Sequence, residues 1–213
     1  MAVTYSQNGV IVKPTGFDVI GGKKYKTVQM PDGKIWLAEN LDFKFCDIGG
    51  SGTNITSVKA WYCNNDESTY GWNGYKCGLL YNWYAVTLLN DNRADLCLGW
   101  HVPTKDEWNT LITACGGASA GNKLKALDGS AGTSWPSSWN GTDDYGFGAL
   151  PAGYRSGSTG VFASVGTHCV LWSNTGYSSN NAWRPVIQQD GSISVDSRLK
   201  TDAYTIRLVR DAT

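Results

Sequence analysis

Charged residues are scarce in this chain of 213 residues. Only 17% are Asp, Glu, Lys or Arg, and the 18 basic residues balance the 18 acidic ones. Nucleic-acid recognition usually requires a basic patch, so the composition excludes a nucleic-acid partner. Intrinsic disorder requires high charge and few aromatics, and the chain has neither. The sequence therefore predicts one large folded domain or two small ones.

Long apolar runs are also missing. No segment has the length and apolarity of a membrane span, so we expect no membrane insertion. The N-terminus, MAVTYSQNGVIVKPTG, lacks the basic start and apolar run of a signal peptide. We therefore expect either a mature or recombinant form, or a protein that leaves its cell without a leader. A phage structural protein released by lysis would do so.

Histidine is nearly absent, and the cysteines follow no metal-binding pattern. The six Cys, at positions 46, 63, 77, 97, 115 and 169, contain no CxxC pair and match no zinc ribbon. We therefore predict no metal and no cofactor. Cys63 and Cys77 flank a polar, aromatic excursion and could close it, whereas Cys115 is expected to be a buried thiol.

The histidines do not suggest a nucleophilic site. A Cys-His nucleophile needs its thiol and its base in contact. His168 and Cys169 are neighbours in sequence, so in a strand their side chains point to opposite faces. His101 is interpreted as structural. We therefore predict a protein that is not an enzyme.

Glycine and large aromatics are abundant, with 26 Gly, 10 Trp and 11 Tyr. Many glycines indicate many turns. Trp and Tyr provide rigid, amphipathic contact area at binding surfaces, although most of the Trp are expected in the core. The composition favours an aromatic framework with ordered loops.

The strongest local signal is a helix over residues 104–115. Thr104 and Glu107 have the spacing of a capping box, and Pro103 disfavours an earlier start. One face is apolar at helical spacing, and Gly116 and Gly117 end the helix. Its apolar positions are Trp108, Leu111, Ile112 and Cys115.

The remaining pattern predicts an α+β fold. Pro31-Asp32-Gly33 between two alternating runs, 24–30 and 34–38, indicates a β-hairpin. Residues 46–78 are predicted as a long ordered loop, and 79–86 as a second helix. A short element at 123–127 is followed by short strands at 147–150, 161–164, 170–173, 182–187, 192–195 and 204–209.

Several motifs in fixed order carry a family resemblance. They are IWLAENL (35–41), LYNWYA (80–85), GWHVPT (99–104) with Glu107-Trp108, YGF (145–147), ALPAGYR (149–155), WS (172–173), AW (182–183) and VRD (209–211). The series resembles the Fibrobacter succinogenes major paralogous domain, from about residue 20 to the C-terminus. We accordingly assign 1–20 as a lead-in strand or linker and 21–213 as the domain.

The resemblance implies a branch of the C-type-lectin-like fold, similar to formylglycine-generating enzymes and to variable proteins of diversity-generating retroelements. It implies two helices packed on small antiparallel sheets, with long ordered loops and with the N- and C-terminal strands paired. It also implies a ligand face built from the late strands and loops, roughly 155–200. The resemblance is far more specific for fold than for function.

The chain departs from these relatives in three ways. Family members often carry Cys where this chain has Leu208, which removes a disulfide and leaves Cys97 without its expected partner. The Glu-Pro-Asn and Gln-Pro-Asp motifs of calcium lectins are missing, so calcium-mediated sugar binding is not supported. The reactive Cys pair of formylglycine-generating enzymes has no counterpart.

The late segment carries many polar residues around framework aromatics, and two interpretations fit it equally. It is either a diversified binding face or an ordinary polar sheet edge. On the first interpretation Trp72, in the loop 61–84, borders the ligand face. The other predicted ligand-binding residues are Tyr154, Arg155, His168, Cys169, Val170, Trp172, Tyr177, Asn181, Arg184, Gln188, Asp190, Ser192, Ser194, Asp196 and Arg198.

The functional hypothesis is a non-enzymatic recognition module. It would bind a cell-surface glycan or protein and act as an adhesin or phage receptor-binding protein, outside the cell, on its surface or on a virion. The alternative is a formylglycine-generating-type enzyme or an accessory domain of a carbohydrate-active enzyme. A third possibility is a structural module in a larger assembly, which the low, balanced charge would suit.

Overall fold

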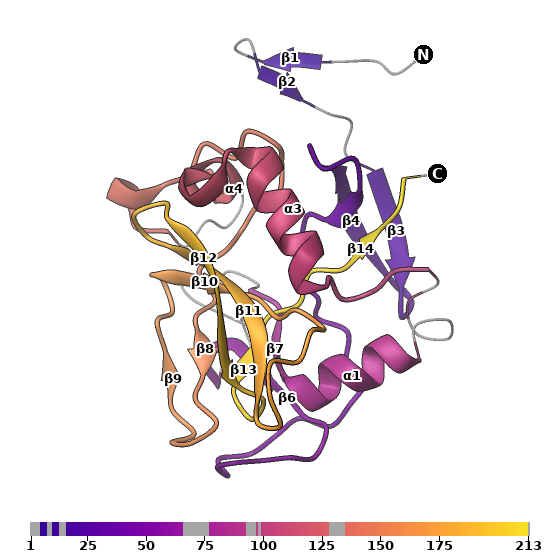
Figure 1. Cartoon of the computed structure of the whole chain (residues 1–213), viewed down its shortest axis with the longest axis vertical. Helices are drawn as coiled ribbons and strands as arrows, with labels where there is room; N and C mark the ends of the chain where they lie inside the picture. The colour runs from indigo at the N-terminus through magenta and orange to yellow at the C-terminus, as the bar shows by residue number, and fades with distance from the viewer. Residues whose placement is uncertain are drawn as a thin grey trace.

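The computed structural model describes residues 5–7, 10–12, 16–65, 77–92, 97, 99–127 and 135–212 (Figure 1). Its helices are α1 (Trp83–Asp91), α3 (Lys105–Cys115) and α4 (Gly121–Leu124), with 3-10 turns η1 (Cys63–Asn65), η2 (Gly117–Ser119) and η3 (Ser137–Trp139). No helix in this part of the chain has the length and apolarity needed to cross a bilayer.

The described strands pair antiparallel in separate small sheets, which confirms the α+β class. They are β1 (Tyr5–Gln7), β2 (Val10–Val12), β3 (Gly16–Ile20), β4 (Lys23–Gln29), β5 (Ile35–Leu37), β6 (Ala60–Tyr62), β7 (Leu79–Asn82), β8 (Tyr154–Arg155), β9 (Phe162–Ala163), β10 (His168–Val170), β11 (Asn181–Gln188), β12 (Ile193–Leu199), β13 (Ala203–Tyr204) and β14 (Val209–Arg210). The sheet orders are β1-β2, β14-β5-β4-β3, β6-β7-β13-β8-β9 and β10-β11-β12.

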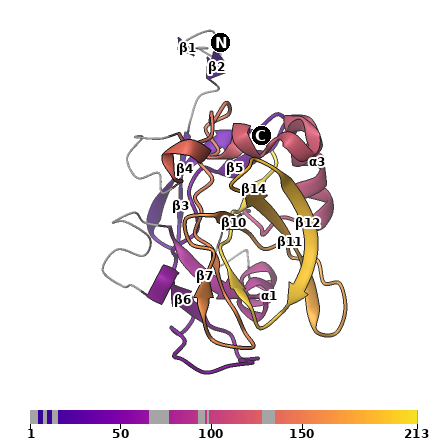
Figure 2. The ribbon, with the colours of Figure 1, turned by 90° about the vertical axis from the view of Figure 1, so that its left-hand side faces the viewer.

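The last strand lies in one sheet with the early strands, although the resemblance implied direct pairing of the N- and C-terminal strands. β14 pairs with β5, and β3 forms the opposite edge beside β4. β3 therefore adds residues 16–20, which lie in the expected lead-in strand or linker, to this sheet. In both views β3 and β4 lie on the other side of the molecule from β11 and β12 (Figure 1, Figure 2).

The predicted hairpin is confirmed. β4 and β5 pair in register, with Val28 opposite Trp36. Met30 and Lys34 are joined by a backbone hydrogen bond, and Gly33 between them has φ +85°, a conformation that glycine adopts without strain. The Pro-Asp-Gly turn therefore does what its sequence predicts.

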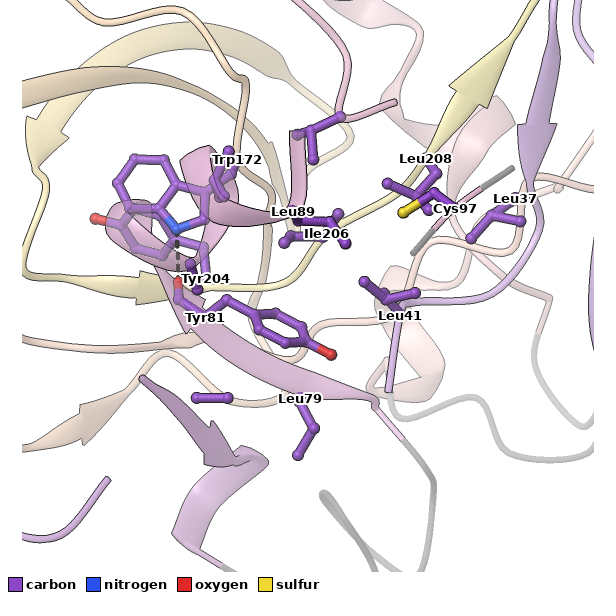
Figure 3. Close-up of a cluster of buried hydrophobic side chains, with 14 of the residues drawn as sticks. Leu37, Leu41, Leu79, Tyr81, Leu89, Cys97, Trp172, Tyr204, Ile206 and Leu208 are labelled. Carbon is purple, nitrogen blue, oxygen red and sulfur yellow. Dashed lines mark hydrogen bonds between the residues drawn. The ribbon is translucent and has the colours of Figure 1, made fainter. Parts of the chain in front are cut away.

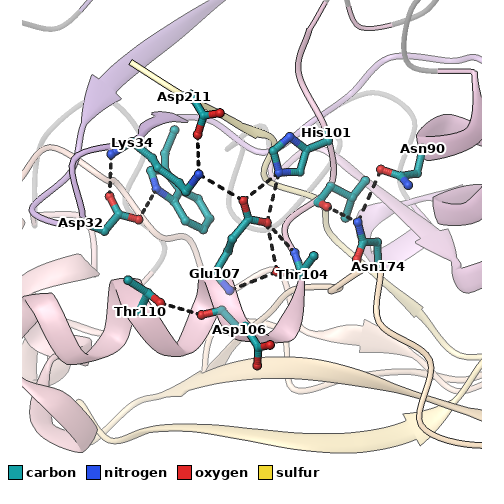
Figure 4. A network of polar contacts seen from close by, with 12 residues as sticks. Asp32, Lys34, Asn90, His101, Thr104, Asp106, Glu107, Thr110, Asn174 and Asp211 are labelled. Atoms are coloured by element: carbon teal, nitrogen blue, oxygen red, sulfur yellow. Dashed lines mark hydrogen bonds and ion pairs between the residues drawn. The ribbon is translucent and has the colours of Figure 1, made fainter. Parts of the chain in front are cut away.

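The capped helix is confirmed in detail. The Thr104 hydroxyl accepts from the Glu107 amide, the Glu107 carboxylate accepts from the Thr104 amide, and Gly116 ends α3 in the left-handed region. Figure 4 shows that Glu107 also meets His101 and Lys34, and that Lys34 pairs with Asp211. This network ties the start of α3 to the β4–β5 turn and to the C-terminus, which gives His101 a structural role.

The second predicted helix starts later than the sequence indicated. Leu79–Asn82 forms the buried strand β7, which pairs with β6 and β13, and only then does α1 begin. The Asn82 side chain accepts from the Ala85 amide, so it caps α1 at this point. A short apolar run that is buried on all sides has no period that separates strand from helix.

One aromatic and aliphatic cluster joins the two halves of the chain (Figure 3). Trp172 is fully buried, its ring lies 4.4 Å from that of Tyr204, and its Nε1–H donates to the Tyr81 carbonyl at 2.6 Å. Cys97 lies beside Leu208 in the same cluster. The contact between Cys97 and Leu208 is therefore apolar packing in the core.

A second cluster lies between α3 and the β10-β11-β12 sheet. Trp108, Leu111, Ile112 and Cys115 of α3 are buried there together with Ile187 and Ile193. Figure 1 shows α3 beside β11 and β12. The apolar helix face and the buried Cys115 are both confirmed.

The long loop is partly ordered by side chains. Within the described residues it contains β6 and η1, and the Trp61 Nε1–H donates to the Gly50 carbonyl at 3.0 Å. Cys63 and Cys77 are both buried in one small cluster. The aromatics Tyr70, Trp72 and Tyr75, which we expected at the border of the ligand face, lie outside the described residues.

The late strands agree only in part with the prediction. The strands predicted at 182–187 and 192–195 are confirmed in β11 and β12. The strand predicted at 147–150 is wrong, because the carbonyls of Phe147 and Gly148 accept from the buried Arg207 guanidinium instead. The run 204–209 splits into β13 and β14. Between these strands the carbonyls of Thr205, Ile206 and Leu208 accept from the backbone amides of Trp172, Leu41 and Leu37.

Two further strands and the short element are shifted. The structure gives β9 at Phe162–Ala163 and β10 at His168–Val170, where 161–164 and 170–173 were expected. The element expected at 123–127 is α4, and its helical turn ends at Leu124. Short strands flanked by Gly and Ser lack the alternation that would fix their ends.

Candidate ligand cavity on the late strands

A cavity of about 450 Å³ lies over one face of the β10-β11-β12 sheet. Its volume falls in the range of small-molecule sites. Strands β8 and β13 and the loops after β8 complete its wall. The lining residues are Tyr154, Ser156, Ser158, Ser164, His168, Val170, Arg184, Val186, Gln188, Ser194, Asp196, Arg198, Leu199, Asp202 and Tyr204.

Strand alternation selects which side chains reach this cavity. On β11 the residues Arg184, Val186 and Gln188 line it, while Ile187 between them packs toward α3. On β12 the residues Ser194, Asp196 and Arg198 line it in the same way. Successive side chains of a strand point to opposite faces, so one face of the sheet is the cavity floor and the other belongs to the core.

A cross-strand ion pair forms the centre of the floor. Arg184 and Asp196 are direct partners in the β11–β12 register. The Arg184 Nε lies 2.9 Å from Asp196 Oδ1, and its Nη2 lies 3.4 Å from Oδ2. Arg198 Nη2 lies 3.4 Å from the same Oδ2. The pairing of the two strands therefore sets the geometry of the charged groups.

Aromatic packing holds this ion pair from below. The Arg184 guanidinium carbon lies 4.9 Å from the centre of the Tyr204 ring, which in turn packs on Trp172. The Tyr204 hydroxyl donates to Asp202 Oδ2 at 2.7 Å, and the Gly157 amide donates to Asp202 Oδ1 at 2.7 Å. Each layer fixes the one above, so the floor is preorganised.

His168 sits at one end of the floor as a neutral ring. Burial and the nearby positive charge of Arg184 lower its pKa below the usual value, so the ring is uncharged near neutral pH. Its Nδ1 lies 2.8 Å from the Thr167 hydroxyl. Its cross-strand partner is Gln188, which gives that end of the cavity two groups able both to donate and to accept.

A family model describing the Fibrobacter succinogenes major domain matches residues 32–210. The chain belongs to this family. The match spans most of the sequence and includes every residue of the cavity wall. No curated protein and no solved structure matches the chain.

Half of the predicted contact residues of this Fibrobacter succinogenes major domain meet in the cavity. They share an inward position on the late strands, and they are Tyr154, His168, Val170, Arg184, Gln188, Ser194, Asp196 and Arg198. Val170 is 1% exposed and contributes only floor surface. The structure therefore brings together residues that the sequence had only grouped by segment.

Five predicted contact residues are buried; Val170 and Arg184 still line the cavity, but for the other three that part of the prediction is wrong. Arg155 is 1% exposed, and it stacks on Trp61 and donates to the Gly52 carbonyl. Cys169 and Trp172 are fully buried on the core side. Each points away from the cavity or lies beneath it, so these residues support the floor from the interior.

Four others are accessible but lie outside the cavity wall. Tyr177 is 59% exposed and packs edge-on against Trp183, and Asn181 begins β11. Asp190 and Ser192 bond to each other in the β11–β12 turn. Trp72 lies outside the described residues.

Sequence reasoning missed several members of the wall. Val186 could have been found, since it lies two residues after Arg184 on the same strand face. Ser156, Ser158 and Ser164 gave no signal, because the loops after β8 have no periodicity. Asp202 and Tyr204 reach the wall only because β13 pairs between β7 and β8.

The arrangement offers no Cys-His dyad in the cavity. His168 lines the wall, whereas Cys169 points into the core, as alternation predicted. Burial raises the pKa of the Cys169 thiol to about 12, so it stays protonated and unreactive. Among the described residues, no three His, Cys, Asp or Glu side chains gather as a metal site would require.

Proposed function

We propose that this domain is a non-enzymatic recognition module that binds a cell-surface glycan or protein in the late-strand cavity. One observation carries the proposal: the inward face of β11 and β12 presents Gln188, Ser194, Asp196 and Arg198 to a cavity, while Ile187 and Ile193 on the outward face are packed in the core. A sheet edge without a binding role would need no concave wall preorganised by the packing of Tyr204 on Trp172.

The same proposal includes a C-type-lectin-like fold. Its support is the order of elements: an early hairpin, two helices α1 and α3, a long loop, and late strands whose last member returns to the first sheet. It also places the protein outside the cell, on its surface or on a virion, in an adhesin or a phage receptor-binding role.

We do not extend the proposal to catalysis. The formylglycine-generating alternative needs reactive thiols in a shared cleft. Burial raises the pKa of the Cys97 thiol to about 12 and that of the Cys46 thiol, with help from Asp47, to about 11. These changes oppose thiolate formation.

The direct test is to fill the cavity. Ser194 is exposed on the floor, and Ser194→Tyr adds a ring there without touching the core. Ser179→Tyr, in an exposed loop outside the wall, is the matched control. Labelled protein would be measured on a glycan array and on a panel of whole bacterial cells.

We expect the wild-type domain and Ser179→Tyr to bind the same targets and Ser194→Tyr to lose them. Equal binding by all three would overturn the cavity as the binding site. A wild-type domain that binds neither array nor cells would overturn the recognition function itself.

A further inference from the structure

The cavity wall is unusually polar for a small-molecule site. Such sites are mostly apolar with a few placed polar groups. Here Val170, Val186 and Leu199 supply the aliphatic surface, and the rest of the wall carries hydroxyl, amide, imidazole, guanidinium or carboxylate groups. A ligand that satisfies such a wall must itself carry many hydrogen-bonding groups, because buried polar groups left unpaired cost binding energy.

The charges of the wall are balanced. Arg184 and Arg198 are opposed by Asp196 and Asp202, and the wall contains no lysine or glutamate. An anionic ligand would have to compete with Asp196 for both guanidinium groups. A neutral ligand meets no such competition, and charge complementarity therefore favours it.

The Arg184–Asp196 pair presents donors and acceptors side by side. Arg184 has five N–H donors, and Asp196 engages its Nε and Nη2. The Asp196 side chain is 39% exposed, so its oxygens can accept further bonds from the cavity. Two neighbouring hydroxyls of a sugar, each a donor and an acceptor, match this arrangement.

The same contacts disfavour a bound calcium ion. Calcium takes six to eight oxygen ligands. Both oxygens of Asp196 face guanidinium groups, and both oxygens of Asp202 accept hydrogen bonds from Gly157 and Tyr204. A calcium ion would have to displace these partners. At Asp196 the positive charge that a calcium ion would supply is already supplied by the Arg184 guanidinium.

Building on the proposed recognition function, we propose that the cavity binds a neutral glycan through a vicinal diol. The Arg184–Asp196 pair grips the two hydroxyls without calcium. Tyr154, whose ring meets that of Tyr204 edge-on at 6.1 Å, supplies an aromatic wall for the apolar face of the sugar ring. The ligand is then selected by hydroxyl geometry and not by charge.

The test uses an array that carries neutral oligosaccharides beside their uronic-acid counterparts, probed in EDTA and in calcium chloride. We expect binding to neutral glycans that is equal in both buffers. Mild periodate, which cleaves the carbon–carbon bond between vicinal hydroxyls, should abolish it. Preference for the acidic series, a requirement for calcium or resistance to periodate would each overturn the inference.

Substitutions on the cavity floor test whether the Arg184–Asp196 pair contributes to glycan binding. Asp196→Asn keeps the side-chain size but removes the charged acceptor, and we expect about a tenfold to hundredfold loss of affinity. Asp106→Asn, an exposed carboxyl in the first turn of α3, is the matched control and should bind as the wild type does. Unchanged affinity in folded Asp196→Asn would overturn the assigned role of the pair.

A second variant separates a loss of binding from a loss of folding. Arg198 is half exposed, and Arg198→Ala should weaken binding while its thermal midpoint stays at the wild-type value. Whole cells distinguish the two proposals. If Ser194→Tyr loses cell binding but periodate-treated cells still bind the wild type, the diol inference fails and the recognition function stands.

Discussion

The two faces of the β10-β11-β12 sheet are built from alternate residues of the same strands and differ in almost every property. The helix-facing side places Cys169, Ile187 and Ile193 against α3 in a closed core. The cavity-facing side places Arg184, Ser194 and Asp196 in an open wall. The difference teaches that one residue of strand phase separates side chains that stabilise the core from side chains that line the proposed binding cavity.

The separation of the two faces determines how much a substitution on each face should affect stability. Side chains on the helix-facing side contribute buried apolar area, so their loss leaves a void. Exposed side chains on the cavity side contribute little to the core, so they can be exchanged at low cost. This is the property that a diversified binding face would require.

The largest expected loss of stability comes from the core between α3 and the helix-facing side of the sheet. Trp108 is fully buried, 4.7 Å from the ring of Trp36, and its Nε1–H donates to the Trp172 carbonyl. Trp108→Ala should reduce the free energy of unfolding by about 3–5 kcal/mol in a denaturant titration. The exposed neighbour Asn109→Ala should change it by less than about 0.5 kcal/mol. Similar values for both variants would break the comparison.

The capping residue Glu107 of α3 should make an intermediate contribution to the free energy of unfolding, and this contribution should depend on pH. Partial burial favours protonated Glu107, but hydrogen bonds from His101 and Thr104 outweigh it and lower the pKa from 4.5 to about 2. Because the folded pKa lies below the unfolded one, stability from ionised Glu107 is present above about pH 5. It is lost as the pH falls toward 2.

Glu107→Gln isolates this contribution, because glutamine can still complete the capping box. We expect the variant to be less stable than the wild type at pH 7 by about 1–3 kcal/mol, and the gap to close near pH 2. Denaturant midpoints across this range would measure it. A constant gap at every pH would show that the carboxylate charge plays no part.

The smallest effect on stability is expected on the cavity side. Gln188 is half-buried on the wall, and Gln188→Ala should change the free energy of unfolding by less than about 0.5 kcal/mol. Its binding on the array should weaken measurably, because Gln188 lines the cavity opposite His168 in the β10–β11 register, at one end of the floor. A large loss of stability with unchanged binding would reverse the assignment of this face.

Local chemistry predicted the elements whose ends are fixed by their own residues. Thr104 and Glu107 cap α3, and Pro31 and Gly33 turn the hairpin. The prediction failed where backbone groups bond to distant partners. Arg207 takes the carbonyls of Phe147 and Gly148, some 60 residues away in sequence, and no local pattern contains that information.

The candidate site shows the same division. The late segment grouped Arg184, Gln188, Ser194, Asp196 and Arg198 by sequence position, and the pairing of β11 with β12 placed them on one surface. The buried positions of Arg155 and Trp172 were not foreseen, because both residue types also occur at binding surfaces.

By itself the sequence determined the helix cap and the hairpin, because each depends on neighbours within a few residues, and the α+β class and the family, because ordered motifs along the chain carry them. Only the tertiary structure decided which strands pair across the chain and which wall residues meet. It also decided that the polar face encloses a hollow, because β13 inserts between β7 and β8 and brings Tyr204, with the preceding Asp202, to the cavity wall, where Tyr204 packs against Arg184. Pairing between distant strands costs loop-closure entropy and is stabilised by contacts between distant residues, and no short stretch of sequence contains that information.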